Sequence, residues 1–230
     1  MRRALLGVTA VLLPAVLLAG CGKDTGTAIG TGNGNGTSDG SGTVKSLPPA
    51  TTAVPTGLAA LVVVPTGFLA PESSDPREVS GPFDSSSYLA TLSSVPPEDK
   101  ALLLNASFKE GYHAFRTSPD RRKRLTVQLF KTGSKAKAVV LQQGFWDQDD
   151  HSTKFAVPGA PGALSDAKLA VTGDPGQSAA TAEVSFVVGD LVAEISVREL
   201  GKTGSNLVPD TALVASLAKQ QKDRLTHGTG

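Results

Sequence analysis

The chain has 230 residues, with 22 basic and 21 acidic side chains, so its formal net charge is +1. Nothing in this balance suggests the concentrated basic footprint that nucleic-acid-binding proteins usually carry. Cys21 is the only cysteine, which excludes a disulfide within the chain and a metal site built from several thiolates. A chain of this length has room for one domain with a substantial core, and its stability must come from packing.

The first 20 residues have the parts of an export signal. Arg2 and Arg3 supply a positive start, and residues 4–19 are almost purely apolar and end in small side chains. A membrane-spanning helix needs roughly 20 apolar residues, so this run is too short to span a bilayer. We therefore expect residues 1–20 to be a signal peptide that is cleaved. Its removal leaves 20 basic and 21 acidic residues, a net charge of −1.

The four residues at the expected cleavage point, Leu18-Ala19-Gly20-Cys21, resemble the lipobox of bacterial lipoproteins. This resemblance implies diacylglycerol on the Cys21 sulfur, cleavage before Cys21, and acylation of the new amino terminus, for instance by palmitate. Each buried methylene contributes about 0.8 kcal/mol, so two or three acyl chains hold a protein stably on a bilayer. The implied partner is the membrane and the implied location is the outer face of the cell membrane. The alternative is an ordinary secretory signal followed by a chance cysteine.

Composition divides the rest of the chain into a linker, a domain and a tail. Residues 21–54 are rich in Gly, Thr, Ser and Pro and cannot bury enough apolar surface to order themselves, so they predict a flexible tether. A strongly apolar run over residues 58–68 marks the beginning of an extracytoplasmic domain, which we place at residues 55–226. Residues 227–230 form a short tail.

Short helices and a hairpin are expected in the first half of the domain. Gly, Pro, Ser and Asp predict a loop over residues 71–83, followed by an aspartate-capped helix over 84–92. Two prolines then predict the start of another helix over 96–104, because proline is favoured in a first turn. Alternating apolar side chains predict strands at 108–116 and 124–130 that form a hairpin.

The middle of the domain is expected to contain one helix and two short strands. Ser134 is suited to cap a helix over residues 135–143. Residues 155–157 predict a short edge segment, 158–162 a turn, and 168–171 a further strand.

The clearest hairpin surrounds the two-residue turn Gly189-Asp190. This turn places four apolar pairs opposite each other: Val188 and Leu191, Phe186 and Ala193, Val184 and Ile195, and Ala182 and Val197. The other face of the same strands is polar and carries Glu183, Ser185, Glu194, Ser196 and Arg198. We therefore expect one buried face and one mostly wet face.

A final helix, capped by Asp210, is expected to cover the sheet. Its apolar residues recur at helical spacing and are Val214, Leu217, Ala218 and Leu225. A hairpin followed by a helix thus occurs twice, at residues 108–143 and 181–225. Together these patterns predict an α+β fold, a single antiparallel sheet with helices packed on one face, preceded by a disordered tether.

Aromatic side chains are the candidates for a ligand pocket between the sheet and the helices. They are Phe115, Phe130, Phe145, Trp146 and Phe155. A plain hydrophobic core is the alternative for all five. His113 has no second ligand near it in the sequence, which favours a structural role. His151 follows the acidic stretch 147–150, but this stretch lacks the pattern of a calcium loop and favours a solvated connection. We therefore expect no metal and no cofactor.

Several elements together resemble the soluble domains of actinobacterial cell-envelope lipoproteins and the extracellular sensor-type domains of mycobacterial Ser/Thr kinases. They are the strand Leu125-Thr-Val-Gln-Leu-Phe, the helix over 136–146, the hairpin over 184–197 and the helix over 212–225. The resemblance covers residues 55–225 and implies an antiparallel sheet packed with helices.

The expected function is a non-catalytic binding or interaction module for an envelope component or a small apolar ligand. One alternative is a secreted hydrolase-type enzyme whose Ser, His and acidic groups are brought together by the fold. Another is a structural envelope protein, which predicts an exposed apolar patch.

Overall fold

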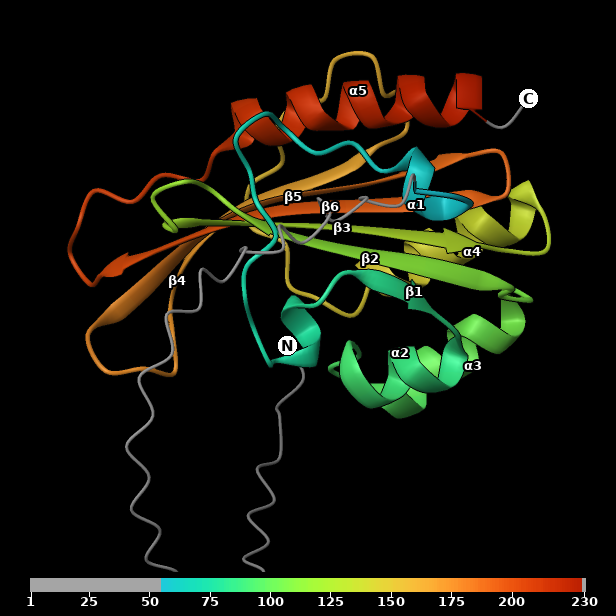
Figure 1. The fold of residues 1–230 in the computed structure, drawn as a ribbon, viewed down its shortest axis with the longest axis horizontal. Helices are drawn as coiled ribbons and strands as arrows, with labels where there is room; N and C mark the ends of the chain where they lie inside the picture. Colours follow the sequence, from blue (N-terminus) through green and yellow to red (C-terminus); the bar gives the residue numbers. More distant parts are fainter. Residues whose placement is uncertain (1–54, 229–230) are drawn as a thin grey trace, which may run out of the picture. The chain divides into compact units, whose positions relative to one another are not determined.

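A computed structural model describes residues 55–228, which form one six-stranded antiparallel sheet with helices (Figure 1). The strands are β1 (Gly81–Phe83), β2 (Glu110–Thr117), β3 (Lys123–Lys131), β4 (Leu164–Val171), β5 (Gln177–Val188) and β6 (Leu191–Lys202). The helices are α1 (Leu58–Leu61), the 3-10 turn η1 (Pro76–Glu78), α2 (Ser85–Thr91), α3 (Pro96–Asn105), α4 (Lys135–Trp146) and α5 (Thr211–Gly228). The expected signal peptide, Cys21 and the tether lie outside the described residues. No helix within residues 55–228 is both long enough and apolar enough to cross a membrane.

The strands are arranged in the order β1-β2-β3-β6-β5-β4, and each neighbouring pair is antiparallel. The β5–β6 hairpin has the predicted register, and all four predicted apolar pairs are Cα partners. Gly189 has a φ of 60° in the turn, which glycine adopts without steric cost. The α+β class and the single antiparallel sheet are therefore confirmed.

Helices cover both faces of the sheet, whereas the sequence predicted helices on one face and water on the other. Helix α5 packs on one face, here called the α5 face, and α2, α3 and α4 lie on the opposite one, here called the α4 face (Figure 1). Both α4 and α5 contact β5 and β6, so the central hairpin is enclosed from two sides. The residues predicted to be wet, such as Glu194, therefore face protein.

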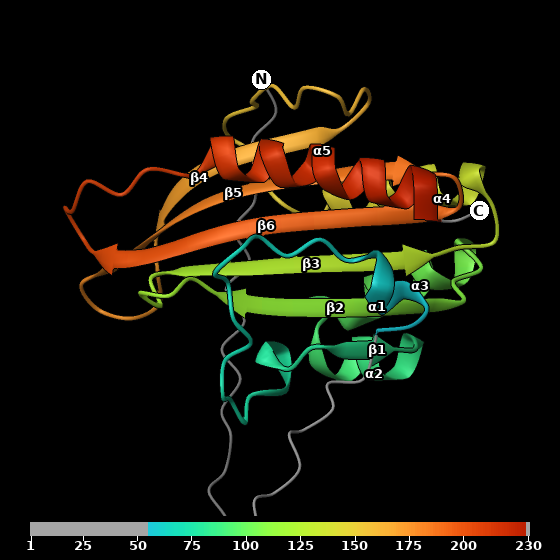
Figure 2. The same cartoon turned by 45° about the horizontal axis from the view of Figure 1, so that its top comes forward.

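The larger core lies on the α5 face. Helix α5 lies across the sheet over β5 and β6 (Figure 2), with Val214, Leu217 and Leu225 buried. Gln221 is also buried, and its side chain accepts a hydrogen bond from the Val63 amide (2.8 Å) and donates one to the Leu61 carbonyl (2.7 Å). These two bonds tie the segment that follows α1 to α5.

An aromatic cluster forms the core of the α4 face. Phe130 of β3 is fully buried, with its ring centroid 5.3 Å from Phe83, 5.4 Å from Tyr88 and 5.2 Å from Phe145. Gly111 makes this packing possible, because a Cβ at that position would lie 2.1 Å from the Phe83 ring.

Side-chain caps fix three of the helix starts, as the sequence predicts. Asp84 accepts a hydrogen bond from the Ser87 amide (2.8 Å) at α2, and Asp210 accepts one from the Leu213 amide (3.0 Å) at α5. Ser134 accepts one from the Lys137 amide (3.3 Å) at α4. Such a cap supplies an acceptor for an amide that the helix itself leaves unpaired.

Other boundaries differ from the predicted ones. Strand β1 forms inside the predicted loop over 71–83, because Gly81–Phe83 can pair along the edge of β2, where a proline is tolerated. Strand β4 begins at Leu164 rather than at residue 168, since its pairing with β5 extends beyond the apolar part. Residues 155–157 were predicted as an edge segment and are irregular.

Candidate functional site

A cavity of about 180 Å³ lies on the α4 face of the sheet, beside the aromatic cluster. Its charged and aromatic lining residues are Tyr88, Asp99, Phe145, Trp146, Asp149, His151, Glu183 and Glu194. Its remaining lining residues are Leu92, Ser94, Thr126, Gln128, Gln148, Val184, Ser185, Ile195 and Ser196. These residues come from α2, α3 and α4, from the segment after α4, and from β3, β5 and β6. The cavity is thus lined by elements that are distant in the sequence.

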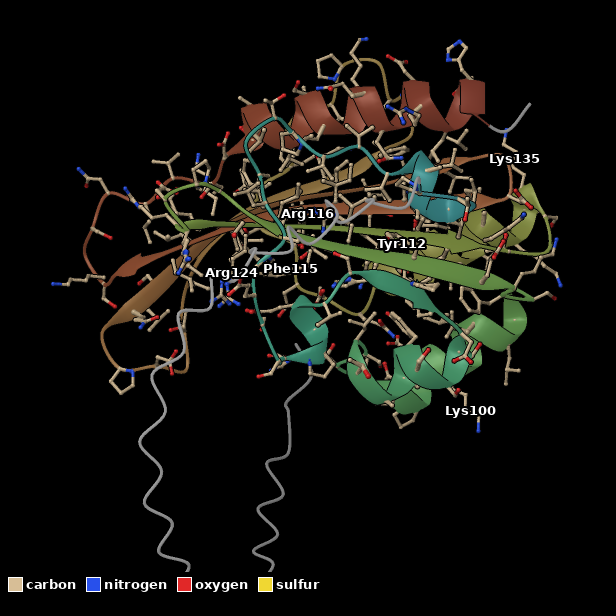
Figure 3. The ribbon with its side chains drawn as sticks, in the orientation of Figure 1. Lys100, Tyr112, Phe115, Arg116, Arg124 and Lys135 are labelled. Carbon is tan, nitrogen blue, oxygen red and sulfur yellow. The ribbon has the colours of Figure 1, made fainter. Side chains whose placement is uncertain are left out.

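Four carboxyl groups line the cavity, and within residues 55–228 no lysine or arginine lines it. Lys168 approaches from outside the lining, with its Nζ 3.1 Å from Glu183 Oε1. Lys100 of α3 extends away from the sheet (Figure 3). The cavity therefore contains an excess of negative charge, which favours a cationic ligand.

Glu194 of β6 faces this cavity. Burial, together with the negative charges of Glu183, Asp99 and Asp149, raises the pKa of its carboxyl to about 8. None of the described residues forms an ion pair with Glu194. Burial likewise raises the pKa of the Tyr88 hydroxyl, together with the charges of Glu194 and Asp99. A positive charge placed here would favour ionisation of Glu194.

The Ser185 hydroxyl lines the cavity and has no hydrogen-bond partner among the described residues. Ser185 is only 1% exposed, and its backbone carbonyl accepts a hydrogen bond from the side-chain amide of Gln142 (2.8 Å). A buried polar group without a partner costs roughly 1–3 kcal/mol. A ligand in the cavity could supply that partner.

His151 stands at one wall of the cavity, stacked on Trp146. The two ring centroids are 3.9 Å apart and the ring planes differ by 8°. Nε2 of His151 lies 2.6 Å from the Trp146 carbonyl oxygen, which can only accept, so Nε2 carries the proton. Nδ1 faces the carboxyl groups of Asp166 (3.9 Å) and Glu183 (4.0 Å).

The five aromatic residues predicted to form a pocket are not brought together. Phe145 and Trp146 reach the cavity, and Phe130 lies behind it in the core. Phe115 is buried on β2 (Figure 3), and Phe155 packs against the core of the α5 face. Sequence patterns do not identify Tyr88, Glu194 or Asp99 as site residues. The reason is that α3 and α4 bury polar side chains, and no local sequence pattern indicates such burial.

A second hollow, of about 330 Å³, lies beside η1, β1 and α2. Val79, Pro82 and Phe83 supply much of its apolar lining, and His113 also lines it. The His113 ring is occupied, since Nε2 donates to the Arg77 carbonyl (2.9 Å) and Nδ1 accepts from the Gln128 amide (3.3 Å).

A serine–histidine pair of the kind that hydrolases use is absent from the part of the chain that the structure describes. His151 and His113 bond to carbonyl or amide groups, and His227 bonds to the Asp223 carbonyl. None of these rings hydrogen-bonds to a serine hydroxyl.

Comparison with known proteins finds no match in sequence and a distant likeness in structure. No protein-family model matches the chain, and no curated protein sequence matches it. Among solved structures, the chain is similar to the extracellular domain of PknH from Mycobacterium tuberculosis, with 10% sequence identity and a TM-score of 0.33. This match covers 64% of the present chain and 77% of the PknH domain.

Proposed function

We propose that this chain is a lipid-anchored, extracytoplasmic binding module whose ligand is a small organic cation. The acidic cavity on the α4 face carries this proposal: four carboxyl groups line it without a balancing lysine or arginine among the described residues, and the buried Ser185 hydroxyl lacks a partner. Its volume exceeds that of a single ion, and aromatic rings form part of its wall. An ammonium group would lie among the carboxylates, with its apolar body against the rings.

This ligand chemistry refines the expectation of a small apolar ligand. Phe145, Tyr88 and Leu92 offer apolar contact, but Glu194 and Asp99 lie in the same space. A wholly apolar molecule would leave the Glu194 carboxyl group without a partner, which is unfavourable. An amphipathic cation satisfies both kinds of surface, and amine-bearing components of the cell envelope have this chemistry.

The lipid anchor is tested by replacing Cys21 with serine. Wild-type protein is expected to partition with membranes and to incorporate labelled fatty acid, because the Cys21 thiol is the acceptor for the lipid. The Cys21→Ser chain should be found in the aqueous phase after detergent phase separation, unlabelled. Equal partitioning of both chains with membranes, with no label in either, would contradict anchoring at Cys21.

Calorimetric titration at pH 8 with three probes of similar size tests the proposed ligand class. Butylammonium is expected to bind, whereas neutral 1-butanol and anionic butyrate should not, because only the cation is attracted by the carboxylates. Glu194→Gln should weaken butylammonium binding by about tenfold, since one negatively charged partner is lost. Glu98→Gln, which removes an exposed carboxylate from α3, is the matched control and should bind as wild type does.

Two outcomes of the titration would contradict the proposal. One is equal binding of butanol and butylammonium, which would identify an apolar site. The other is unchanged butylammonium affinity in Glu194→Gln, which would place the cation elsewhere on the protein.

A further inference from the structure

Two acidic residues lie directly opposite each other on the α4 face. Asp166 of β4 and Glu183 of β5 are Cα partners in the sheet. Like charges in this position destabilise a sheet unless something lies between them. Lys168 partly neutralises Glu183, with its Nζ 3.1 Å from Glu183 Oε1. No lysine or arginine in the part of the chain that the structure describes forms an ion pair with Asp166.

The Asp166 carboxylate is held rigidly and is only half satisfied. Its Oδ1 accepts hydrogen bonds from the backbone amides of Ser152 (2.8 Å) and Thr153 (2.7 Å). Its Oδ2 is buried and has no hydrogen-bond partner, and the whole residue is 0% exposed. A carboxylate oxygen fixed in this way, without a donor, points to a ligand that is itself positive.

His151 is the third residue of this group. Its Nδ1 atom faces the carboxyl groups of Asp166 and Glu183. Nε2–H donates to the Trp146 carbonyl and the ring is stacked on the indole, so both the tautomer and the orientation of the ring are fixed. Nδ1 is therefore unprotonated in the neutral ring, 3.9 Å from Asp166 Oδ2 and 4.0 Å from Glu183 Oε1. Histidine ligands of metal ions are oriented by hydrogen bonds of this kind from the other ring nitrogen.

We propose that His151 Nδ1, Asp166 Oδ2 and Glu183 Oε1 bind a divalent transition-metal ion at the wall of the cavity. One imidazole and two carboxylates form a donor set that suits ions such as Zn²⁺. Bonds of about 2.0–2.2 Å allow two ligand atoms of one ion to be at most about 4.4 Å apart. The two distances from His151 fall below this limit, whereas the 4.8 Å range within which all three ligand atoms lie is slightly above it. Glu183 is partly exposed and is free to close on the ion, with Lys168 moving aside.

This metal site shares His151 and Glu183 with the lining of the cavity, but it differs from the proposed organic-cation site in its other residues. Asp166 does not line the cavity, and Glu194 and Ser185 are not among the metal ligands. Neither proposal depends on the other, and they are tested with different variants.

The single tryptophan provides a direct reporter, since Trp146 stacks on the ligand His151. The untagged full chain, purified in detergent and treated with chelator, is titrated with Co²⁺ while tryptophan emission is measured. We expect saturable quenching that Zn²⁺ competes away and that EDTA reverses. Asp166→Asn, which keeps an oxygen acceptor for the Ser152 and Thr153 amides, should weaken Co²⁺ binding by about tenfold or more.

Asp150→Asn is the matched control, because Asp150 precedes His151 in the sequence but is not one of the three ligands. It should bind Co²⁺ as wild type does. Glu183→Gln removes a second ligand and should also weaken Co²⁺ binding by about tenfold. Butylammonium binding is also measured in Asp166→Asn. A variant that binds butylammonium but not Co²⁺ is folded and has lost the metal site alone. The metal proposal is overturned by the absence of saturable quenching in wild type, or by equal Co²⁺ affinity in wild type and in both ligand variants.

Discussion

Phe130→Ala is expected to lower the free energy of unfolding by about 3–5 kcal/mol, the range for removing a large aromatic side chain from a rigid core. Phe130 is fully buried, and its ring centroid lies between 5.2 and 5.4 Å from those of Phe83, Tyr88 and Phe145. These neighbours belong to three other elements, so they cannot all move into the space that the ring leaves.

Urea denaturation monitored by circular dichroism measures this loss. Phe155→Ala is the matched control: Phe155 is only partly buried, at the edge of the other core, and its loss should cost less than about 2 kcal/mol. A loss below about 1 kcal/mol for Phe130→Ala, combined with weaker butylammonium binding, would show that Phe130 belongs to the ligand pocket rather than to the core.

Glu194→Gln is expected to stabilise the protein at pH 7, by an amount on the order of 3 kcal/mol. The pKa of Glu194 is raised from an ordinary value of 4.5 to about 8 in the folded chain. The folded state therefore holds the Glu194 proton more tightly than the unfolded state does. The contribution of this group to stability is full below pH 4.5 and is lost as the pH rises toward 8.

Glutamine does not titrate, so the stability difference between the variant and wild type should grow with pH. Urea denaturation at pH 4.5, 6, 7 and 8 should show almost no difference at the lowest pH and the full gain at pH 8. A difference that stays constant with pH would contradict the burial of an ionisable Glu194. A variant that is less stable than wild type at pH 8 would contradict it as well.

The β5–β6 hairpin shows how much of the fold can be predicted from local sequence. A two-residue turn at Gly189 fixes the register, and alternation then fixes which side chains share a face. The helix caps at Asp84, Ser134 and Asp210 are local in the same sense, because each cap and its amide lie three residues apart. Features of this kind depend on neighbours in the chain, and the structure confirms them.

The candidate site could not be predicted in the same way. Alternation shows that Glu183 and Glu194 share a polar face, but it does not show that α3 and α4 return to enclose that face. His151, Asp166 and Glu183 meet only because β4 pairs with β5 and because the segment after α4 is hydrogen-bonded to Asp166 of β4. Strand β4 also begins earlier than its apolar residues indicate, so Asp166 was not recognised as a strand residue.

The most direct test of a cation site beside Glu194 is the affinity for butylammonium at pH 7 and pH 9. A primary ammonium group has a pKa of about 10.4 and stays charged at both values, whereas Glu194 ionises between them. We predict that wild-type affinity rises by about tenfold from pH 7 to pH 9, because binding at pH 7 must first release the Glu194 proton. We predict no comparable rise in Glu194→Gln. An affinity for butylammonium that is equal at both pH values in wild type, or that rises equally in the variant, would contradict a cation bound beside Glu194.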